Sequence, residues 1–406
     1  MRPNDPVGQA TSLACSAGFQ PAESARSNPP AGWKPAQRDR QDGCPTAAQS
    51  RRTFIKTLGA VGAVAALTPA GFAAETTSPA KARLKLGMDN FAVRAMGWKA
   101  GALLDYAASL KLDSLFLTDL DAFENHEPAY LREVKAKAEG LGIGIHLGSW
   151  SICPSAKWFK NKWGTAEEHL ALGIRMAKDL GSPIIRIVLG GYEERKSEGG
   201  IEARIAETVK VIQSCRTRAQ DAGVKIAVEN HAGDMQAWEL VTLIEAAGKD
   251  YVGANVDSGN ACWTIEDPLT SLETLAPYAL STSLRDSMVW ETPNGAMVQW
   301  TAMGDGCVDW KPYFAKFAEA CPQVPVHIET ISGGPREFAY LKPEFWKDYP
   351  KARAHEFARF LALAKQGKAI PAHKGGDAKE QQEFQKADLE RSIRYCKETL
   401  GLGLKA

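Results

Sequence analysis

The sequence predicts an α/β protein built as a (β/α)8 barrel, the TIM barrel architecture, between an N-terminal signal segment and a C-terminal helical extension. Short β-rich runs alternate with helical patterns over roughly 260 residues, which suits eight strand–helix units. The run Ile-Ile-Arg-Ile-Val-Leu at 184–189 is almost wholly apolar, as expected of a strand buried on both faces of a parallel sheet. Helical patterns end at Gly142, Gly181 and Gly223, and glycine is the usual residue after a helix. An open doubly wound sheet is the alternative, disfavoured because no G-x-G-x-x-G segment follows the first strand.

The eight strands are expected at residues 84–88, 114–118, 142–147, 184–189, 225–229, 252–257, 279–285 and 326–329. Helices are expected at 131–141, 166–180 and 201–222, and a helix at 351–366 is expected to close the barrel. A link rich in helix breakers at 367–376 then leads to an amphipathic helix at 377–399, expected to fold back on the barrel. The barrel domain is therefore assigned to 83–367 and the C-terminal extension to 368–406.

The N-terminal segment differs in composition from the rest. Residues 1–49 are rich in Pro, Ala, Gly, Ser and Gln and are predicted to be a disordered leader; a start codon further along the chain would leave them untranslated. Residues 50–74 contain Ser-Arg-Arg-Thr-Phe-Ile-Lys, then a short apolar run and small residues. This layout is typical of a twin-arginine signal peptide, although an arginine pair before a buried helix is the alternative. We therefore expect the twin-arginine export machinery as a partner and a periplasmic or secreted location. The apolar run is too short for a stable membrane anchor.

Charge and composition exclude several classes of protein. The chain has 406 residues, 44% hydrophobic and 24% charged, as in an ordinary globular protein. After residue 74 it carries 41 basic and 44 acidic residues. A nucleic-acid partner is not expected, because neutralising phosphates requires a basic surplus. The oligomeric state is left open.

Three carboxylates each directly follow an apolar strand: Glu229, Asp257 and Glu329. The carboxyl ends of barrel strands meet at the mouth, where the active sites of such barrels lie. Three acids converging there repel one another unless a cation or protons neutralise them, and oxygen ligands suit Mg²⁺, Mn²⁺ or another divalent ion. Each acid taken alone is equally well explained as a helix cap or an ion-pair partner.

From residue 83 to about residue 366 the chain resembles the sugar phosphate isomerase/epimerase family of xylose isomerase-like barrels. The resemblance rests on Glu-Asn-His-Ala-Gly-Asp at 229–234, Asp-Ser-Gly-Asn at 257–260, Ile-Glu at 328–329 and Met-Gly-Asp-Gly-Cys-Val-Asp-Trp at 303–310. It implies one divalent metal ion (Mn, Mg, Co or Zn) bound by two Glu, one Asp and one His. In this chain the acidic ligands would be Glu229, Asp257 and Glu329.

One position departs from the family pattern. Ser283 stands where the histidine ligand should lie, three residues before Asp286. Serine is a poor ligand for a divalent metal, so we expect a weakened or altered site rather than a lost one. His231 and His327 are the neighbouring residues that could supply nitrogen.

The resemblance also implies a mechanism and a substrate class. Glu229 and Glu329 would be the catalytic pair: one removes the proton next to a sugar carbonyl and the other returns it through an enediolate. The expected function is a periplasmic sugar isomerase or epimerase. The alternatives are a lyase acting on 3-keto-glycosides, which shares the first step, and a non-catalytic sugar-binding barrel. An endonuclease of the same superfamily would need more histidines and a basic groove.

Further residues are expected to contact a small sugar substrate: His231, Asn260, Arg285, His146, Arg186 and Trp150. Arginines bind hydroxyl or carboxylate groups, and exposed tryptophans suit stacking on a sugar ring. A structural role is an equal alternative for both arginines, for His146 and for Trp150. A loop at 290–303 is expected to act as a lid.

Overall fold

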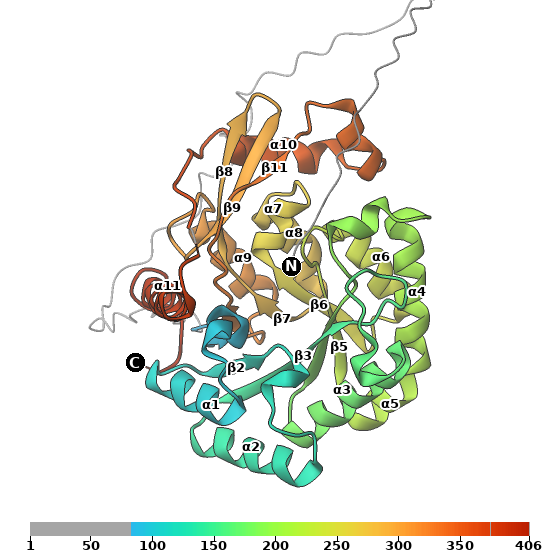
Figure 1. The fold of residues 1–406 in the computed structure, drawn as a ribbon, viewed down its shortest axis with the longest axis vertical. Helices are drawn as coiled ribbons and strands as arrows, with labels where there is room; N and C mark the ends of the chain where they lie inside the picture. The colour runs from blue at the N-terminus through green and yellow to red at the C-terminus, as the bar shows by residue number, and fades with distance from the viewer. Residues whose placement is uncertain (1–82, 374, 406) are drawn as a thin grey trace, which may run out of the picture. The chain divides into compact units, whose positions relative to one another are not determined.

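The computed structural model describes residues 83–373 and 375–405. The predicted leader at 1–49 and signal peptide at 50–74 lie outside these residues. Within the described part, helices surround a central parallel barrel, and a smaller antiparallel sheet projects from it (Figure 1).

The barrel contains eight parallel strands in the order β10-β1-β2-β3-β4-β5-β6-β7, which confirms the predicted fold class. They are β1 (Leu86–Asp89), β2 (Ser114–Leu117), β3 (Gly144–Ser151), β4 (Ile184–Val188), β5 (Lys225–Glu229), β6 (Val252–Asp257), β7 (Ala279–Ser283) and β10 (Val326–Ile328). The barrel closes between β7 and β10, which have the shortest pairing of the eight. There, Leu284 N donates to His327 O (2.8 Å) and Glu329 N donates to Leu284 O (2.9 Å), so β10 lies beside the end of β7.

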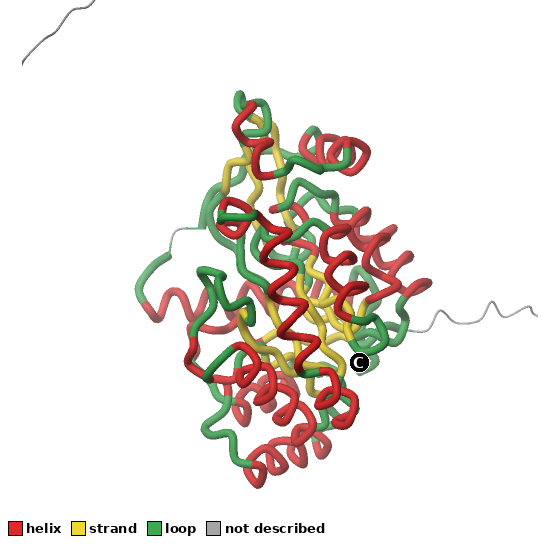
Figure 2. Tube along the Cα trace, turned by 90° about the vertical axis from the view of Figure 1, so that its right-hand side faces the viewer, coloured by secondary structure: helices red, strands yellow, loops and turns green. Residues whose placement is uncertain are grey.

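Helices cover the outside of the barrel, and Figure 2 shows them in front of the strands. They are α1 (Ala100–Ser109), α2 (Pro128–Gly140), α3 (Ala166–Leu180), α4 (Gly200–Ser214), α5 (Arg216–Ala222), α6 (Ala237–Ala247), α8 (Pro268–Leu275) and α9 (Trp310–Ala320). The single helix expected at 201–222 is divided into two helices at Cys215, because the backbone of this residue is not helical (φ −99°, ψ 4°). Helix α3 begins with a capping box between Thr165 and Glu168 and ends at Gly181 in the left-handed region.

Short helices line the loops. The 3-10 helices are η1 (Asn90–Met96), η2 (Leu120–Ala122), η3 (Asn161–Trp163), η4 (Tyr192–Lys196), η5 (Ala276–Tyr278) and η6 (Pro343–Asp348), and α7 spans Ser258–Trp263. Two of them begin where a barrel strand ends, because Asp89 caps η1 and Asp257 caps α7 with their side chains.

A second sheet follows β7. Its strands β8 (Asp286–Thr292), β9 (Gly295–Thr301) and β11 (Arg336–Phe338) are antiparallel, in the order β11-β9-β8. The segment 290–303, expected to be a lid loop, is thus mostly a β-hairpin. Helix α10 (Ala354–Ala364) packs on this sheet through Phe360 and Leu363, in a cluster with Val289 and Phe338. The helix expected at 351–366 therefore forms, but it covers the added sheet.

Helix α11 (Ala378–Glu398) takes the closing role instead. Its Leu389, Ile393 and Cys396 belong to the main barrel core, and the helix contacts η1 and β10. After it, Gly403 N donates to Leu84 O (2.9 Å), which ties the C-terminal segment to the start of β1. The expected C-terminal helix is thus confirmed. In the part of the chain that the structure describes, no helix is long and apolar enough to cross a membrane.

The amino-terminal half of the barrel interior is filled by Phe116, His146 and His327. The His327 Nε2 atom lies 3.0 Å from Ser114 Oγ. Burial lowers the pKa of His146 to about 4 and that of His327 well below its usual value, so both rings are neutral near pH 7. His146 also lines a cavity of about 810 Å³ at the amino-terminal end of the strands.

Gly87 leaves no room for a side chain in β1. A Cβ atom there would lie 2.3 Å from Ser114 Oγ, 2.5 Å from Ser114 O and 2.7 Å from His327 Cδ2. The clash includes backbone, so β1 and β2 would have to separate. We expect Gly87→Ala to lower the free energy of unfolding by about 1–3 kcal/mol, measured by urea denaturation.

Gly101→Ala in α1 is the matched control, since its Cβ would meet only Lys137 Nζ, at 3.9 Å. It should be neutral or should stabilise the protein by up to about 1 kcal/mol. Equal effects of the two substitutions would contradict the proposed close approach of β1 and β2.

Candidate active site

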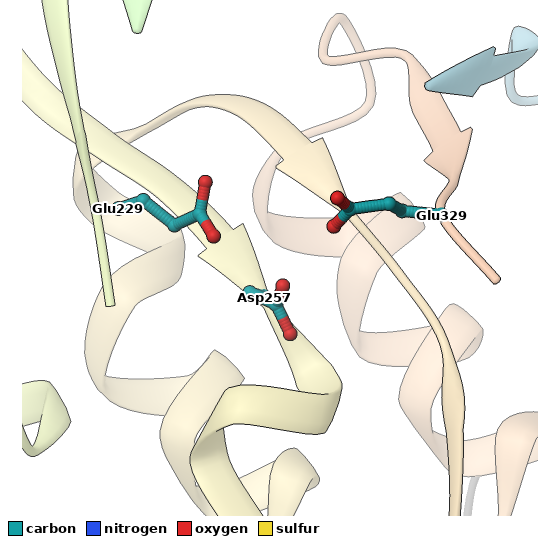
Figure 3. A group of neighbouring side chains, drawn as sticks. All are labelled: Glu229, Asp257 and Glu329. Atoms are coloured by element: carbon teal, nitrogen blue, oxygen red, sulfur yellow. The ribbon is translucent and has the colours of Figure 1, made fainter. Parts of the chain in front are cut away.

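Three carboxylates meet at the carboxyl end of the barrel. Glu229 ends β5, Asp257 ends β6 and Glu329 follows β10 directly. One oxygen of each lies within 4.8 Å of those of the other two. Figure 3 shows Glu229 and Glu329 extending toward each other from opposite sides, with Asp257 between them. All three side chains are buried, so their charges must be compensated within the protein.

Two buried arginines supply most of that compensation. Arg186, in β4, places Nε 2.8 Å from Glu229 Oε2, and its other nitrogens donate to Ser149 O (2.7 Å) and Thr118 Oγ1 (2.6 Å). The Arg285 Nη2 atom donates to both Asp257 Oδ2 and Glu329 Oε2. Each guanidinium is 2% exposed, so these are buried ion pairs whose removal on one side would leave an uncompensated charge.

Two side-chain amides also donate hydrogen bonds to Glu229. Asn255 Nδ2 donates to Glu229 Oε2 (3.0 Å) and Asn260 Nδ2 donates to Glu229 Oε1 (3.2 Å). Asn260 N also donates to Asp257 Oδ1 (2.8 Å). Asn260 was expected from its place after β6, whereas Asn255 lies inside that strand and carries no sequence signal of a site.

A fourth carboxylate, Asp89 at the end of β1, lies beside this group. It accepts hydrogen bonds from Phe91 N (2.8 Å) and from Ser283 Oγ (3.3 Å), and Asn255 Nδ2 donates to Ser283 Oγ (3.2 Å). Ser283 is thus at the site, but its hydroxyl bonds to protein groups. Asp89 stands among the polar strand ends of the sequence, yet no motif singled it out.

Burial shifts the proton affinities of these acids. It raises the pKa of Asp89 to about 8, aided by the charge of Glu329 and opposed by Arg186. It raises the pKa of Asp257 to about 7 against the opposing charge of Arg285, and it raises that of Glu229 well above the usual value against that of Arg186. Asp89, Glu229 and Asp257 therefore bind protons more strongly than exposed carboxylates do, as expected where buried acids outnumber the guanidinium groups beside them.

The donor set fits a divalent metal ion poorly. The Arg285 nitrogen lies between two of the three candidate ligand oxygens, Asp257 Oδ2 and Glu329 Oε2. Both oxygens of the third candidate, Glu229, are already bonded. A dication placed here would be repelled by a fixed guanidinium within a buried site, and Ser283 offers a neutral hydroxyl in place of an imidazole.

A cavity of about 320 Å³ opens above the carboxylates, a size in the range of small-ligand sites. Glu229, Glu329, Arg186, Arg285 and Asn260 line its floor. Its walls are aromatic: Trp150 stacks on Trp158 (centroids 5.6 Å apart) and Trp263 stacks on Trp300 (3.9 Å). Trp158 and Trp300 come from a loop and from the added sheet, where sequence patterns gave no indication of a site.

His231 also lines this cavity. Its Nδ1 lies 2.6 Å from Gly190 O, so the Nδ1–H tautomer fits and leaves Nε2 as an acceptor. Burial, with the charge of Arg186, lowers the pKa of His231 to about 3. Asp234 fixes the backbone of this loop, because it accepts from His231 N (2.8 Å) and Gly190 N (3.2 Å).

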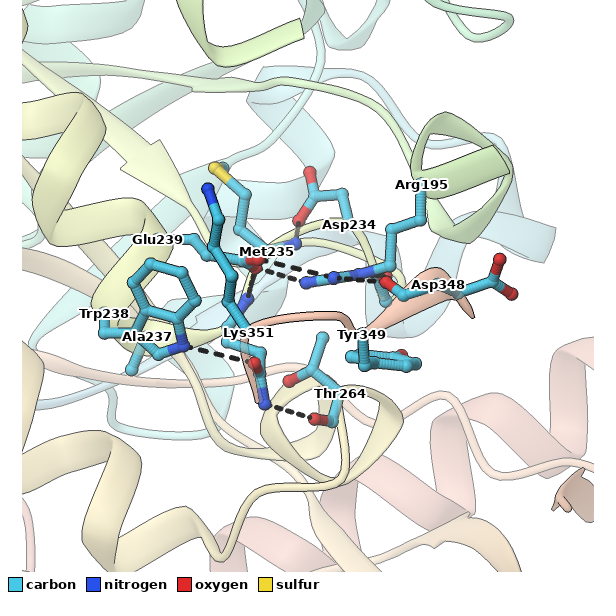
Figure 4. Close-up of polar contacts among 12 residues, drawn as sticks. Arg195, Asp234, Met235, Ala237, Trp238, Glu239, Thr264, Asp348, Tyr349 and Lys351 are labelled. Atoms are coloured by element: carbon cyan, nitrogen blue, oxygen red, sulfur yellow. Dashed lines mark hydrogen bonds and ion pairs between the residues drawn. The ribbon is translucent and has the colours of Figure 1, made fainter. Parts of the chain in front are cut away.

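A buried ion pair holds the rest of the β5–α6 loop (Figure 4). Arg195 bonds to Glu239 and donates to Gly233 O (3.3 Å) and Asp348 O (3.0 Å). Its guanidinium lies over the ring of Tyr349, 4.3 Å from the centroid. Three separate segments are thereby joined behind His231, which favours a rigid wall on this side of the cavity.

Asp286 and the 303–310 motif are structural partners. Asp286 accepts from Ser287 N (2.8 Å), Gly304 N (3.0 Å) and Trp310 Nε1 (2.8 Å). A Cβ at Gly306 would lie 2.1 Å from Asp286 Oδ1, so glycine is required there. These contacts anchor the added sheet beside the barrel.

The structure therefore brings together most of the residues expected from the sequence. Glu229, Asp257, Glu329, Arg186, Arg285, Asn260, His231 and Trp150 meet at the cavity or its floor. His146 does not, because its position in β3 places it in the amino-terminal half of the barrel, where it lines the opposite cavity. His327, considered as a nitrogen donor, lies in the same lower layer.

Comparisons with known proteins agree with this architecture. Residues 104–349 match the family model described as xylose isomerase-like TIM barrel. Residues 49–68 match the twin-arginine translocation signal sequence, which confirms the predicted signal and indicates export to the periplasm or beyond. No curated protein gave a significant match.

Among solved structures, D-psicose 3-epimerase in the presence of D-fructose is 14% identical, with a TM-score of 0.52 over 78% of this chain and 100% of that one. A xylose isomerase domain protein from Planctomyces limnophilus is 21% identical, with a TM-score of 0.46 over 65% and 92%. The apo form of 3-keto-D-glucoside 4-epimerase from E. coli is 11% identical, with a TM-score of 0.48 over 70% and 99%. At these identities the likeness concerns the fold alone. The family match, in contrast, spans more than half of the sequence, and the chain belongs to the xylose isomerase-like TIM barrel family.

Proposed function

We propose that this protein is an exported sugar isomerase or epimerase that moves a proton at a carbon next to a carbonyl group. One observation carries the proposal: Glu229 and Glu329 face each other across the floor of a tryptophan-walled cavity. Two carboxylates on opposite sides of a bound sugar can remove a proton from one face and return it to the other. The family and the epimerase of similar fold are consistent with this chemistry.

The proton transfer follows from the positions of the groups. One glutamate takes the proton from the carbon beside the carbonyl, and the C–H electron pair moves toward the carbonyl oxygen to give an enediolate. The opposite glutamate returns a proton. Return to the same carbon on the other face gives an epimer, whereas return to the neighbouring carbon interconverts an aldose and a ketose.

The environment suits this step. Burial raises the pKa of Glu229 well above its usual value, the direction that favours its role as the proton donor. The two guanidinium groups on the floor can donate to the oxygen on which negative charge develops. The tryptophan walls exclude water and offer flat faces to the C–H side of a sugar ring.

The neutral His231 completes the polar contacts. With Nδ1 committed to Gly190 O, the ring offers Nε2 as an acceptor for a sugar hydroxyl. A lyase acting on 3-keto-glycosides would share the first proton abstraction and then expel the substituent at the next carbon. Release of that substituent would distinguish it from an isomerase.

The divalent ion implied by family resemblance supplies, when bound, a positive charge at the carbonyl oxygen. The proposed proton transfer does not depend on this ion, because its candidate ligands here are bonded to arginine and amide groups.

Replacing either glutamate of the pair tests the proposed proton transfer. Glu229→Gln and Glu329→Gln should each lower the rate of solvent deuterium incorporation into a keto-sugar substrate by about 10²–10⁴-fold, since each loses a proton-transfer group. The measurement is proton NMR of ketoses such as D-fructose or D-psicose, and of 3-keto-glucosides, in deuterated buffer. Glu291→Gln, on the exposed side of β8, is the control. Wild-type protein that binds a sugar without exchanging any carbon-bound proton would instead support a non-catalytic sugar-binding barrel.

A further prediction concerns His231. Histidine in an unfolded chain titrates near pH 6.5, whereas the folded imidazole has a pKa of about 3. Between these values the unfolded chain binds the extra proton, so the free energy of unfolding falls as pH falls, by at most about 1.4 kcal/mol per pH unit. His231→Gln should make the pH profile of unfolding shallower over this range.

His355→Gln is the control for that experiment, because the His355 side chain is 76% exposed. Denaturant unfolding at several values from pH 6.5 to pH 4 measures both profiles. An unchanged slope in His231→Gln would mean that the folded protein accommodates a charged His231.

A further inference from the structure

The first observation is the position of the Arg285 guanidinium. Of the three carboxylates whose oxygens lie within 4.8 Å of one another, two accept hydrogen bonds from the same Arg285 nitrogen. That nitrogen occupies the point from which a single cation would contact both Asp257 and Glu329. The positive charge required at the centre of the cluster is therefore already provided by a side chain.

The second observation is that the surroundings hold Arg285 in this place. The Ser258 hydroxyl donates to Arg285 O (2.7 Å) and accepts from Arg285 N (3.0 Å). A Cβ at Gly259 would lie 2.5 Å from Arg285 Cγ, so the glycine makes room for the arginine stem. The guanidinium carbon lies 4.5 Å from the ring centroid of Trp300, and Trp300 Nε1 donates to Gly259 O (2.9 Å). Ser258, Gly259 and Trp300 thus hold the backbone, the stem and the guanidinium head of Arg285, respectively.

The third observation concerns the missing nitrogen ligand. Ser283 stands at the position where the family resemblance implies histidine, and its hydroxyl bonds to Asp89 and Asn255. Of the two imidazoles that could replace it, His327 lies in the lower layer of the barrel beside Ser114. His231 has Nδ1 committed to Gly190 O and stands in the cavity wall. No imidazole among the described residues completes the carboxylate cluster.

We propose that Arg285 replaces the divalent metal ion in this barrel, as a tethered cation that holds Asp257 and Glu329 and presents its remaining N–H groups to the substrate oxygen. Arg285 lines the cavity, and its Nε, which is itself buried, has no hydrogen-bond partner among the described residues. An arginine stays charged at all relevant pH values and donates in fixed directions. The centre is then complete without metal. The suggested contact to the substrate oxygen rests on the function proposed above, whereas the replacement of the ion does not.

Metal binding tests the replacement directly, without any substrate. Purified mature protein is incubated with Mn²⁺, Co²⁺ or Zn²⁺, desalted and analysed for bound metal, and its thermal unfolding is followed with and without each ion. We expect less than stoichiometric metal and no shift in melting temperature for the wild type. One ion per chain in the wild type, lost in Glu329→Gln, would overturn the proposal.

A designed double variant tests the converse, that the site binds a metal ion once Arg285 is removed. Arg285→Met with Ser283→His removes the tethered cation and restores an imidazole beside Glu229, Asp257 and Glu329. This double variant should bind about one Co²⁺ or Mn²⁺ per chain, and the ion should raise its melting temperature, because a ligand that binds only the folded state stabilises it. The single variant Ser283→His, which keeps Arg285, should remain free of metal. If Ser283→His alone binds one ion, Arg285 does not occupy the metal position.

Should the double variant fail to fold, the wild-type and Ser283→His measurements still decide the question. Failure of the function proposed above would appear separately, as an absence of deuterium exchange in a wild-type protein that is free of metal.

Discussion

The compensation of buried negative charge is the constraint on which the rest of this centre depends. Asp89, Glu229, Asp257 and Glu329 are all at most 4% exposed, and Arg186 and Arg285 form ion pairs with three of them. Moving unpaired carboxylates from water into a protein interior is too costly to sustain. Neighbouring polar groups add to this compensation, because the amides of Asn255 and Asn260 donate hydrogen bonds to Glu229. Burial also raises the pKa of three of these acids, so they bind protons more strongly than exposed carboxylates do.

The architecture meets this constraint by dividing the work between the barrel and its insertion. The strand ends of the barrel supply the carboxylates, β4 supplies Arg186 from within the strand, and parallel strands place the carboxylates at one edge. The antiparallel sheet after β7 supplies Trp300, which stacks against Arg285 and Trp263. Asp286 ties this sheet to the backbone at Gly304 and to Trp310. The long insertion between the seventh and eighth barrel strands is thus part of the site. Without it, Arg285 would lose its contact with Trp300, and the cavity would lose one of its walls.

The sequence alone was sufficient for the barrel and for much of the cluster, because both follow from short patterns. Buried parallel strands have continuous apolar runs, and an acid directly after such a run must lie at the barrel mouth. Other features depend on contacts between distant segments. Asn255 faces the centre from within a strand, and Trp300 arrives on an added sheet. The chain has two amphipathic helices, α10 and α11, either of which could close the barrel. Helix α10 packs against Val289 and Phe338 of the added sheet, and α11 therefore packs on the barrel core. His146 was predicted to contact the substrate but lies in the amino-terminal half of the barrel. The sequence could not show this, because the height of a residue inside a barrel depends on how the strands are staggered.

A tethered guanidinium and a bound dication differ in what they can do for a carbonyl substrate. A dication carries twice the charge and can chelate two oxygens, so it can acidify even a weakly polarised C–H bond. A guanidinium carries one charge and acts through directed hydrogen bonds, whose strength depends on the exclusion of water. The tryptophan walls flank the cavity and its floor is buried, so such a hydrogen bond would be partly shielded from water here. A centre of this kind suits substrates whose proton is already acidic, such as keto-sugars, better than aldoses with masked carbonyl groups.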